Sequence, residues 1–281
     1  VGMLVPNVDT QDIHVQQYRE VKDIIRPGHA EYTFFVKYGD YADWCGAGRA
    51  SGRETVGRVA GGAVAKYILE QENIEVYAYT KESHGIVARD MTFEEVKANY
   101  RKNEINCPDL QTAEKMIADV LEIKKSGDTA GGVVEVIVHG VPAGLGEPVF
   151  DKISADLSKA IMSIGSTKGI EFGAGFKCAR MTGHEWNDDP YVKDGKIRFK
   201  TNNAGGVLGG ISNGEDIVMR VAVKATPTIS IDQESVDMSL MKNTILSAIT
   251  RRDATLLPRI CPVIEAMTRC VVLDHLYMWR A

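Results

Sequence analysis

A histidine follows a Pro-Gly turn near the beginning of the chain, in the segment Arg26-Pro27-Gly28-His29. A Pro-Gly pair is typical of a tight turn, which fixes the backbone that carries the histidine. We expect the turn to lead into a strand, so that His29 stands at the entry of that strand. Imidazole titrates near neutral pH, and a histidine aimed into a cleft can therefore act as a general acid. His29 is a candidate catalytic residue, with an ordinary core or surface histidine as the alternative.

A glycine-rich stretch from Gly46 to Glu54 also carries two arginines, Arg49 and Arg53. Its spacing is not that of the dinucleotide fingerprint GxGxxG, and no clear strand runs directly into it. The free N–H groups of such a loop, together with the positive end of the helix that follows, form an anion site. The alternative is that the glycines serve only a tight turn.

Residues 201–214 hold five glycines, which let a planar ligand approach the backbone closely. The stretch has no GK[ST] sequence, which disfavours a P-loop nucleotidase. In the run that follows, residues alternate in character, so Arg220 and Lys224 share one face of a predicted strand. We expect this face to line an anionic pocket; an ordinary solvated strand face is the alternative.

One aspartate stands beside two arginines in Arg251-Arg252-Asp253, just before the last predicted helix. Such a group is usually a solvated ion pair. In a pocket, the Asp253 carboxylate can instead accept a proton or orient a polar ring nitrogen.

The composition is that of an ordinary globular chain of 281 residues, with 44% hydrophobic and 25% charged residues. No apolar run approaches the roughly 18 residues of a membrane span. A formal net charge of −5 argues against a nucleic-acid-binding protein. The five cysteines have no CxxC spacing, so no metal site is predicted and reduced thiols in the cytoplasm are expected.

The spacing of apolar residues predicts five amphipathic helices, and shorter apolar runs between them predict strands. Ser51 with Glu54, and Thr92 with Glu95, have the spacing of capping boxes at two helix starts. The mixed order favours an α+β or layered α/β fold with largely antiparallel sheets. The predicted helices cover about residues 56–68, 92–101, 109–125, 148–164 and 258–279, and the predicted strands 33–38, 74–80, 132–138, 168–172, 216–224 and 228–232.

Long blocks of the sequence resemble the chorismate synthase family, and they occur in the family's order. The blocks begin with RPGHAEYTFFVKYG and include GVPAGLGEPVFDK and TNNAGGVLGGISNG. They cover residues 26–39, 46–66, 140–173, 201–229 and 251–275.

The resemblance implies a carbon–oxygen lyase of the shikimate pathway, which leads to the aromatic amino acids. The substrate would be 5-enolpyruvylshikimate 3-phosphate, converted to chorismate by a 1,4-anti elimination of phosphate. The family requires reduced FMN without net redox change, and NADPH as well where an enzyme reduces its own flavin. It further implies a homotetramer whose subunits are layered β-α-β sandwiches with helices between antiparallel sheets. No nucleic-acid or membrane partner is expected.

The resemblance also assigns roles to particular residues. His29 and Asp253 match the family's catalytic histidine and aspartate, and Arg26, Arg49 and Arg251 match substrate-binding positions. The positions that match FMN contacts are Arg49, Ala50, Ser51, Gly165, Ser166, Gly209, Lys224, Ala225, Thr226, Pro227, Thr228 and Arg251.

The chain also departs from the family pattern. Residues 1–281 correspond to one domain without the family's N-terminal block, which carries GESHG and a second catalytic histidine. Val1-Gly2-Met3-Leu4-Val5 has the character of a strand interior, so we expect the numbering to begin inside a longer protein. His84 lies in a similar string, Glu82-Ser83-His84-Gly85, but after the first long predicted helix, and we interpret it as a coincidence.

Several single positions differ as well, among them Glu31 for Asp, Ala47 for Gly and Arg252 for His. Two further hypotheses therefore stand beside the lyase. One is an FMN-binding homologue or fragment with little or no activity, and the other is a nucleotide-binding module built on the glycine-rich loops.

Overall fold

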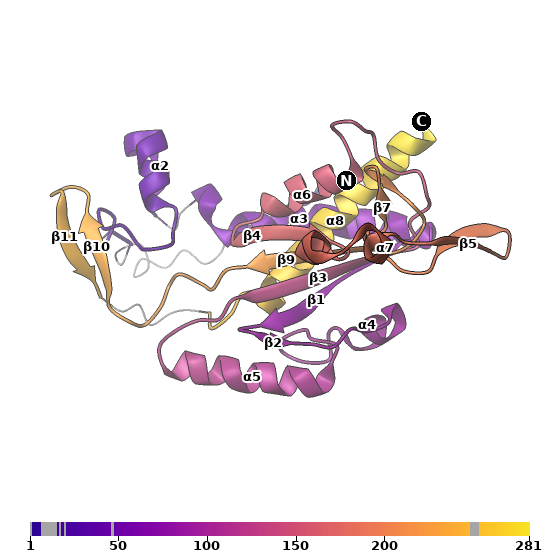
Figure 1. Ribbon diagram of the computed structural model, residues 1–281. Coiled ribbons are helices and arrows are strands. Elements are labelled where there is room, and N and C mark those ends of the chain that lie inside the picture. The colour runs from indigo at the N-terminus through magenta and orange to yellow at the C-terminus, as the bar shows by residue number, and fades with distance from the viewer. Residues whose placement is uncertain (1, 7–15, 17, 20, 46–47, 248–252) are drawn as a thin grey trace.

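A five-stranded antiparallel sheet forms the centre of the protein, with the strand order β2-β1-β3-β9-β4 (Figure 1). The structure is a computed structural model that describes residues 2–6, 16, 18–19, 21–45, 48–247 and 253–281. All of the pairs in the sheet are antiparallel, as the sequence predicts. The strands are β1 (Glu75–Ser83), β2 (Ile86–Val87), β3 (Gly132–His139), β4 (Thr167–Phe172) and β9 (Ile217–Val223).

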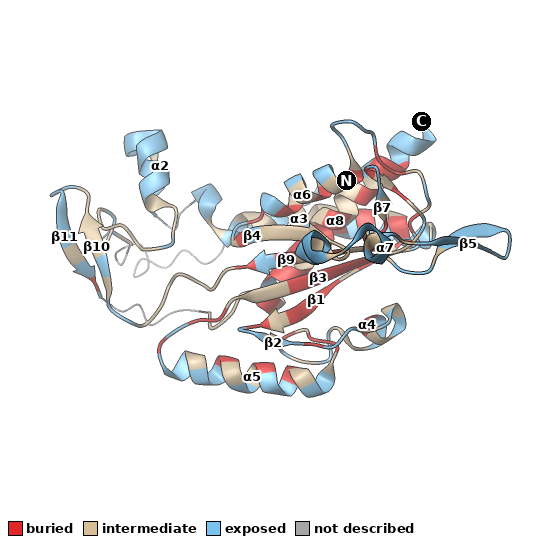
Figure 2. Ribbon diagram, viewed as in Figure 1, coloured by how far each residue is buried: buried red, intermediate tan, exposed pale blue. Residues whose placement is uncertain are grey.

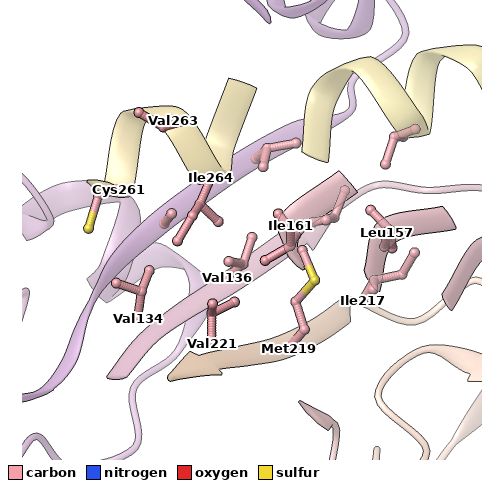
Figure 3. Close-up of a cluster of buried hydrophobic side chains, with 14 of the residues drawn as sticks. Val134, Val136, Leu157, Ile161, Ile217, Met219, Val221, Cys261, Val263 and Ile264 are labelled. Carbon is pink, nitrogen blue, oxygen red and sulfur yellow. The ribbon is translucent and has the colours of Figure 1, made fainter. Parts of the chain in front are cut away.

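Three helices cover one face of this sheet: α3 (Thr55–Gln71), α6 (Ile153–Met162) and the long C-terminal α8 (Leu257–Arg280). Side chains alternate across a strand, so every second residue of β3 points toward these helices. Figure 3 shows Val134 and Val136 of β3 with Val221 of β9 facing Ile264 of α8. Figure 2 places most of the buried residues in this layer between sheet and helices.

The opposite face of the sheet is covered by α4 (Phe93–Asn99) and α5 (Leu110–Lys125) through two smaller apolar clusters. The start of α4 confirms the predicted capping box, because Thr92 accepts from Glu95 N while the Glu95 carboxylate accepts from Thr92 N. Asp109 caps α5 in a similar way by accepting from Thr112 N.

Side chains close the first part of the free edge of β1, and loop backbone closes it farther along, where Thr80 N donates to Asn106 O. Because β2 pairs only with the last residues of β1, the earlier backbone groups on that side need other partners. Glu265 of α8, which is fully buried, accepts from Ala78 N at 3.0 Å. Arg269 donates to Val76 O at 2.8 Å and to the Glu265 carboxylate at 3.2 Å. Arg101, which follows α4, donates to the same carboxylate at 3.0 Å.

A separate group of elements lies at one end of the sheet (Figure 1) and consists of α2 (Glu31–Tyr38) and the hairpin of β10 (Gln233–Asp237) with β11 (Lys242–Leu246). The prediction of a strand over residues 33–38 is therefore wrong. The aromatic and β-branched run favours a strand locally, but α2 buries none of its residues and has no neighbouring strand to pair with. A helix satisfies its own backbone hydrogen bonds, whereas an isolated strand cannot.

The remaining elements are short. Two strand pairs of two to four residues each lie around the sheet together with short helical turns, and Figure 1 shows the β5 hairpin projecting from one side. These elements are β5 (Pro190–Lys193), β6 (Lys196–Phe199), β7 (Val207–Leu208), β8 (Ile211–Ser212), α7 (Gly183–Trp186) and the 3-10 turns Gly39–Tyr41, Gly48–Ala50, Gly52–Glu54 and Gly175–Arg180.

Three further boundaries differ from the sequence expectation. Helix α6 begins at Ile153 and not at Pro148, because Glu147 N bonds to Asp151 O and holds the intervening residues in a turn. No regular strand covers residues 228–232, since this segment bonds to loops and not to a ladder. Ser51 caps the short 3-10 turn before α3 but forms no capping box, because the Glu54 carboxylate bonds to Arg58.

The α+β class and the antiparallel sheets are confirmed. All five cysteines are unpaired, and within the described ranges no helix is both long and apolar enough to cross a bilayer.

We predict that Gly62→Ala destabilises the protein by about 1–3 kcal/mol, the usual cost of overpacking a core. A Cβ atom at Gly62 would lie 2.3 Å from Ala266 Cβ and 2.4 Å from Ala266 Cα, so α3 and α8 would have to move apart. The matched control is Gly61→Ala, where no atom lies within 4 Å of the added Cβ. The control should stabilise helix α3 by about 0.5–1 kcal/mol. Denaturant unfolding of both variants checks the pair, and equal effects would contradict the close contact.

Candidate functional site

Several loops meet at the end of the sheet where β9 finishes and Lys224 follows. The backbone N–H of Lys224 donates to Ser166 O at 3.0 Å, which joins the loop before β4 to the segment 224–228. Thr129 Oγ1 donates to Thr226 O at 2.7 Å and holds the same segment from the side of β3. A Cβ atom at Gly131 would lie 2.8 Å from Ala225 N, so only glycine allows this approach. We call residues 224–228 the Lys224 loop.

The Arg26-Pro27-Gly28-His29 turn lies directly against the Lys224 loop, although the two are about 200 residues apart in sequence. Gly28 has a φ of +73°, and a Cβ atom there would lie 2.7 Å from Pro227 Cβ. Lys224 Nζ donates to Gly28 O at 2.5 Å. Glycine is therefore required at position 28 both by its backbone conformation and by the close contact with Pro227.

His29 is held by the far end of the same loop. Its Nε2 atom lies 2.9 Å from Thr228 Oγ1. Burial, with help from the positive charges of Arg26 and Lys224, lowers the pKa of His29 to about 4, while Glu31 opposes the shift. His29 is consequently neutral at neutral pH in the ligand-free protein. It stands at the entry of helix α2 and not of the predicted strand.

Arg26, a predicted substrate contact, is already paired within the turn. Its Nε donates to Glu31 Oε1 at 2.7 Å, and its guanidinium carbon lies 5.9 Å from the centre of the Tyr18 ring. Glu31 therefore orients Arg26 and offsets part of its charge.

Asp253 lies beside the same end of the sheet. Ala130 N donates to Ala254 O at 2.8 Å, so the segment that contains Asp253 runs next to residues 129–131. The Asp253 carboxylate accepts from Arg259 NH2 at 3.0 Å. Thr129, in the neighbouring segment, contacts the Lys224 loop, so Asp253 and the loop share a neighbour. Arg251 lies outside the described residues.

Gly165 and Ser166 belong to the cluster through the bond from Lys224 N to Ser166 O. The predicted anion loop at Arg49, Ala50 and Ser51 precedes helix α3 and is exposed or half-buried. Arg58, in the first turns of α3, donates to Ser163 Oγ at 2.6 Å. This contact joins α3, which follows the Arg49–Ser51 segment, to the end of α6, two residues before Gly165.

Gly209 is not brought to this cluster by the fold of the chain. It lies in the turn between β7 and β8, where the neighbouring Gly210 O accepts from Ile153 N at the start of α6. Lys224 follows the last residue of β9, while Gly209 lies near its beginning. Strand β9 has seven residues, which separate its ends by about 20 Å.

Arg220 does not line an anionic pocket with Lys224, contrary to the sequence expectation. The two do share a face by alternation, but Arg220 donates to Glu171 at 2.6 Å and to Gly173 O at 2.7 Å. Glu135 lies 3.7 Å from its guanidinium on the other side. The charge of Arg220 is therefore used within the sheet.

His84 lies in the turn between β1 and β2. Its Nδ1 atom is 3.0 Å from Asp119 Oδ2 of α5, and its side chain is well exposed.

The Lys224 loop offers two groups suited to a phosphate. Within the described part of the chain, Lys224 has no ion pair with a carboxylate, and its pKa is lowered by burial and by nearby Lys168. Thr226 Oγ1 is buried and has no hydrogen-bond partner among the described residues. A buried hydroxyl without a partner is costly, and a ligand oxygen would satisfy it.

A cavity of about 310 Å³ opens beyond Glu31, between α2 and the turn after β10. Four carboxylates line it, which makes it unsuited to a phosphate ester. They belong to Asp23, Glu31, Asp40 and Asp43. Among the described residues, no group of three or more His, Cys, Asp or Glu side chains is placed to hold a metal ion.

Sequence analysis did not single out the residues that hold the cluster together. Glu31 was noted only as a departure from the family, and Thr129 and Gly131 were not noted at all. The Pro-Gly turn indicated that Gly28 adopts a special conformation, but its contact with Pro227 depends on the tertiary fold.

Comparison with known proteins identifies the family. The chorismate synthase family model matches residues 1–277. The chorismate synthase of Acetivibrio thermocellus is 57% identical over 281 residues, covering 99% of this chain and 71% of that protein. The chorismate synthase of Archaeoglobus fulgidus is 46% identical over 278 residues, covering 99% of this chain and 76% of that protein.

A solved structure agrees with the sequence relatives. A crystal structure of chorismate synthase superimposes with a TM-score of 0.75 at 30% identity, covering 89% of this chain and 70% of that chain. The chain therefore belongs to the chorismate synthase family.

Proposed function

We propose that the protein is a carbon–oxygen lyase that converts 5-enolpyruvylshikimate 3-phosphate to chorismate. The reaction removes the phosphate and a ring proton in a 1,4-anti elimination, with no net redox change. Family membership supports the proposal, and the observation that carries it for this chain is the Lys224 loop docked on the Arg26–His29 turn. There the Lys224 ammonium, which bonds to Gly28 O but to no carboxylate among the described residues, lies in the same loop cluster as His29. The buried Thr226 hydroxyl, which has no partner in the described part of the chain, belongs to this cluster as well.

The groups present suit a flavin mononucleotide. Lys224 and Thr226 would hold its phosphate or other polar atoms, with Ser166 beside them. Membership of the family adds the Arg49–Ser51 segment to these proposed contacts. Reduced FMN, when bound, would serve as a transient electron donor to the substrate. NADPH would be needed as well only if the protein reduces its own flavin.

The chain's own residues would bind the anionic substrate and move its proton. Arg26, Arg49 and Arg251 would contact the phosphate and carboxylate groups, since guanidinium forks match such anions. His29, which contacts Thr228, and Asp253, which lies next to residues 129–131, would serve as the acid and the base. Because His29 is neutral in the free protein, its role as an acid requires that it first gains a proton.

We further propose that the protein works as a homotetramer in the cytoplasm. Support for assembly comes from large apolar side chains exposed on the single chain, among them Val64 and Tyr67 on α3. Five unpaired thiols suit a reducing compartment.

Turnover under anaerobic conditions tests the proposed function. The protein is mixed with reduced FMN and 5-enolpyruvylshikimate 3-phosphate, and chorismate is measured by its absorbance. Chorismate formation supports the lyase. Flavin binding without turnover would indicate a homologue or fragment that has lost activity, and a preference for ATP or NAD over FMN would indicate a nucleotide-binding module.

Replacement of Lys224 tests the cofactor site. Lys224→Ala should weaken FMN binding at least about tenfold, because a charge-assisted hydrogen bond contributes roughly 1.5–3 kcal/mol. The matched control is Lys168→Ala, which removes a nearby exposed charge. Among the described residues, Lys168 forms no hydrogen bond or ion pair with the Arg26–His29 turn. Fluorescence titration with FMN compares the two, and unchanged affinity in Lys224→Ala would remove Lys224 from the site.

Replacement of the two histidines tests the catalytic assignment. His29→Ala should lower turnover by about 10²–10⁴-fold, the usual contribution of a general acid, while leaving FMN binding near normal. His84→Ala is the control and should change turnover little, because its ring contacts only α5 among the described bonds. Loss of activity in His84→Ala with retention in His29→Ala would show that the family alignment is wrong at both histidines.

A further inference from the structure

The charged groups that face His29 are arranged so that an anion would change its protonation. In the described part of the chain these groups are Arg26 and Lys224, which disfavour a proton on the ring, and Glu31, which favours one. Glu31 is already bonded to Arg26. The Lys224 ammonium, by contrast, bonds to the carbonyl of Gly28, one residue before the histidine, and to no carboxylate in the described ranges.

The Lys224 loop also holds the imidazole ring itself. Thr228 Oγ1 lies 2.9 Å from His29 Nε2, at the opposite end of the loop from Lys224. The intervening Thr226 is fixed through its carbonyl by Thr129, and Pro227 lies against Gly28. A ligand that occupies this loop would therefore act on a histidine whose position is already set.

Resting on the function proposed above, we propose that anion binding at the Lys224 loop is coupled to proton uptake by His29, with Thr228 as the positioning residue for the imidazole. An anion beside Lys224 and Arg26 adds negative potential at the ring and favours its charged form. The proton comes from solvent and enters the ring, and no covalent bond to the ligand forms. Binding of the anionic ligand would thus favour protonated His29, which is the acid that the reaction needs.

The direction of the effect follows from reciprocity between the two binding events. The pKa of His29 in the free protein is about 4, so the ring is neutral at neutral pH. If the bound anion raises this pKa, the anion must in turn bind more tightly as the pH falls toward the free-state value. Each unit by which the pKa rises corresponds to about a tenfold gain in affinity at low pH.

The pKa of His29 is measured by NMR in the full chain, without and with sodium sulfate at constant ionic strength. Sulfate is chosen because it does not titrate in the range of histidine, unlike a phosphate monoester. The His29 resonances are assigned by their absence in His29→Ala. Sulfate should raise the pKa of His29 by at least about one unit. Sulfate binding with an unmoved pKa would overturn the coupling, and so would an absence of sulfate binding at the Lys224 loop.

Two substitutions of Thr228 separate positioning from simple structural support. Thr228→Val removes the hydroxyl at nearly equal volume, and Thr228→Ser retains it. The ¹⁵N shifts of the two ring nitrogens of His29 should change in the valine variant and return in the serine variant. Equal shifts in both variants would show that Thr228 does not position the ring.

Titration with FMN keeps this inference distinct from the proposed function. Sulfate-linked protonation in a chain that does not bind FMN would overturn the FMN site but leave the coupling intact. FMN binding with no sulfate-linked change at His29 would leave the flavin site standing and overturn the coupling.

Discussion

The open edge of β1 is the constraint on which the arrangement of this protein depends. Backbone groups on an unpaired edge must find partners, and here the long helix α8 supplies them through Glu265 and Arg269. A fully buried carboxylate is tolerated only because an amide and two guanidinium groups surround it. The same contacts fix the position of α8 on the sheet, and α3 packs against α8 at Gly62. The sheet, the helix layer and the segment after α4 are thus tied to one buried group.

The candidate site, by contrast, is built mainly from loops and turns. The Lys224 loop is fixed by hydrogen bonds to Ser166 and Thr129, and Gly28 packs against its Pro227. The chain carries a net charge of −5, yet Lys224 is stabilised by a carbonyl and not by a carboxylate. The positive charge of Lys224 is therefore available to a ligand that binds at the Lys224 loop. Arg26 shows the contrasting solution, since Glu31 holds it rigidly and reduces its net attraction for an anion.

Most of the regular structure could be predicted because burial imposes a periodic pattern. Most helices and strands of the protein face a core, so apolar residues recur along them at the period of the element. This holds for the stripes of α3, α5 and α8 and for the apolar runs of β1, β3 and β9. Helix α2 has no core face, and its aromatic run consequently suggested a strand. At the site, His29, Asp253 and the Lys224 loop could be selected from motifs, because catalytic and anion-binding groups have distinctive chemistry. The partners Glu31, Thr129 and Thr228 could not be assigned their contacts, since a hydrogen bond across loops leaves no periodic trace.

The contact between Gly28 and Pro227 has a consequence for how the protein is made. It joins residues about 200 positions apart, and the sheet that carries the Lys224 loop includes β9, which is synthesised after β1, β3 and β4. Loop closure over such a distance is entropically costly and comes late when folding is governed by contact order. During synthesis, the Arg26–His29 turn leaves the ribosome long before its docking surface exists. The nascent chain therefore has no assembled ligand site until nearly the whole domain has emerged, so acquisition of ligand marks the completion of folding and not its nucleation.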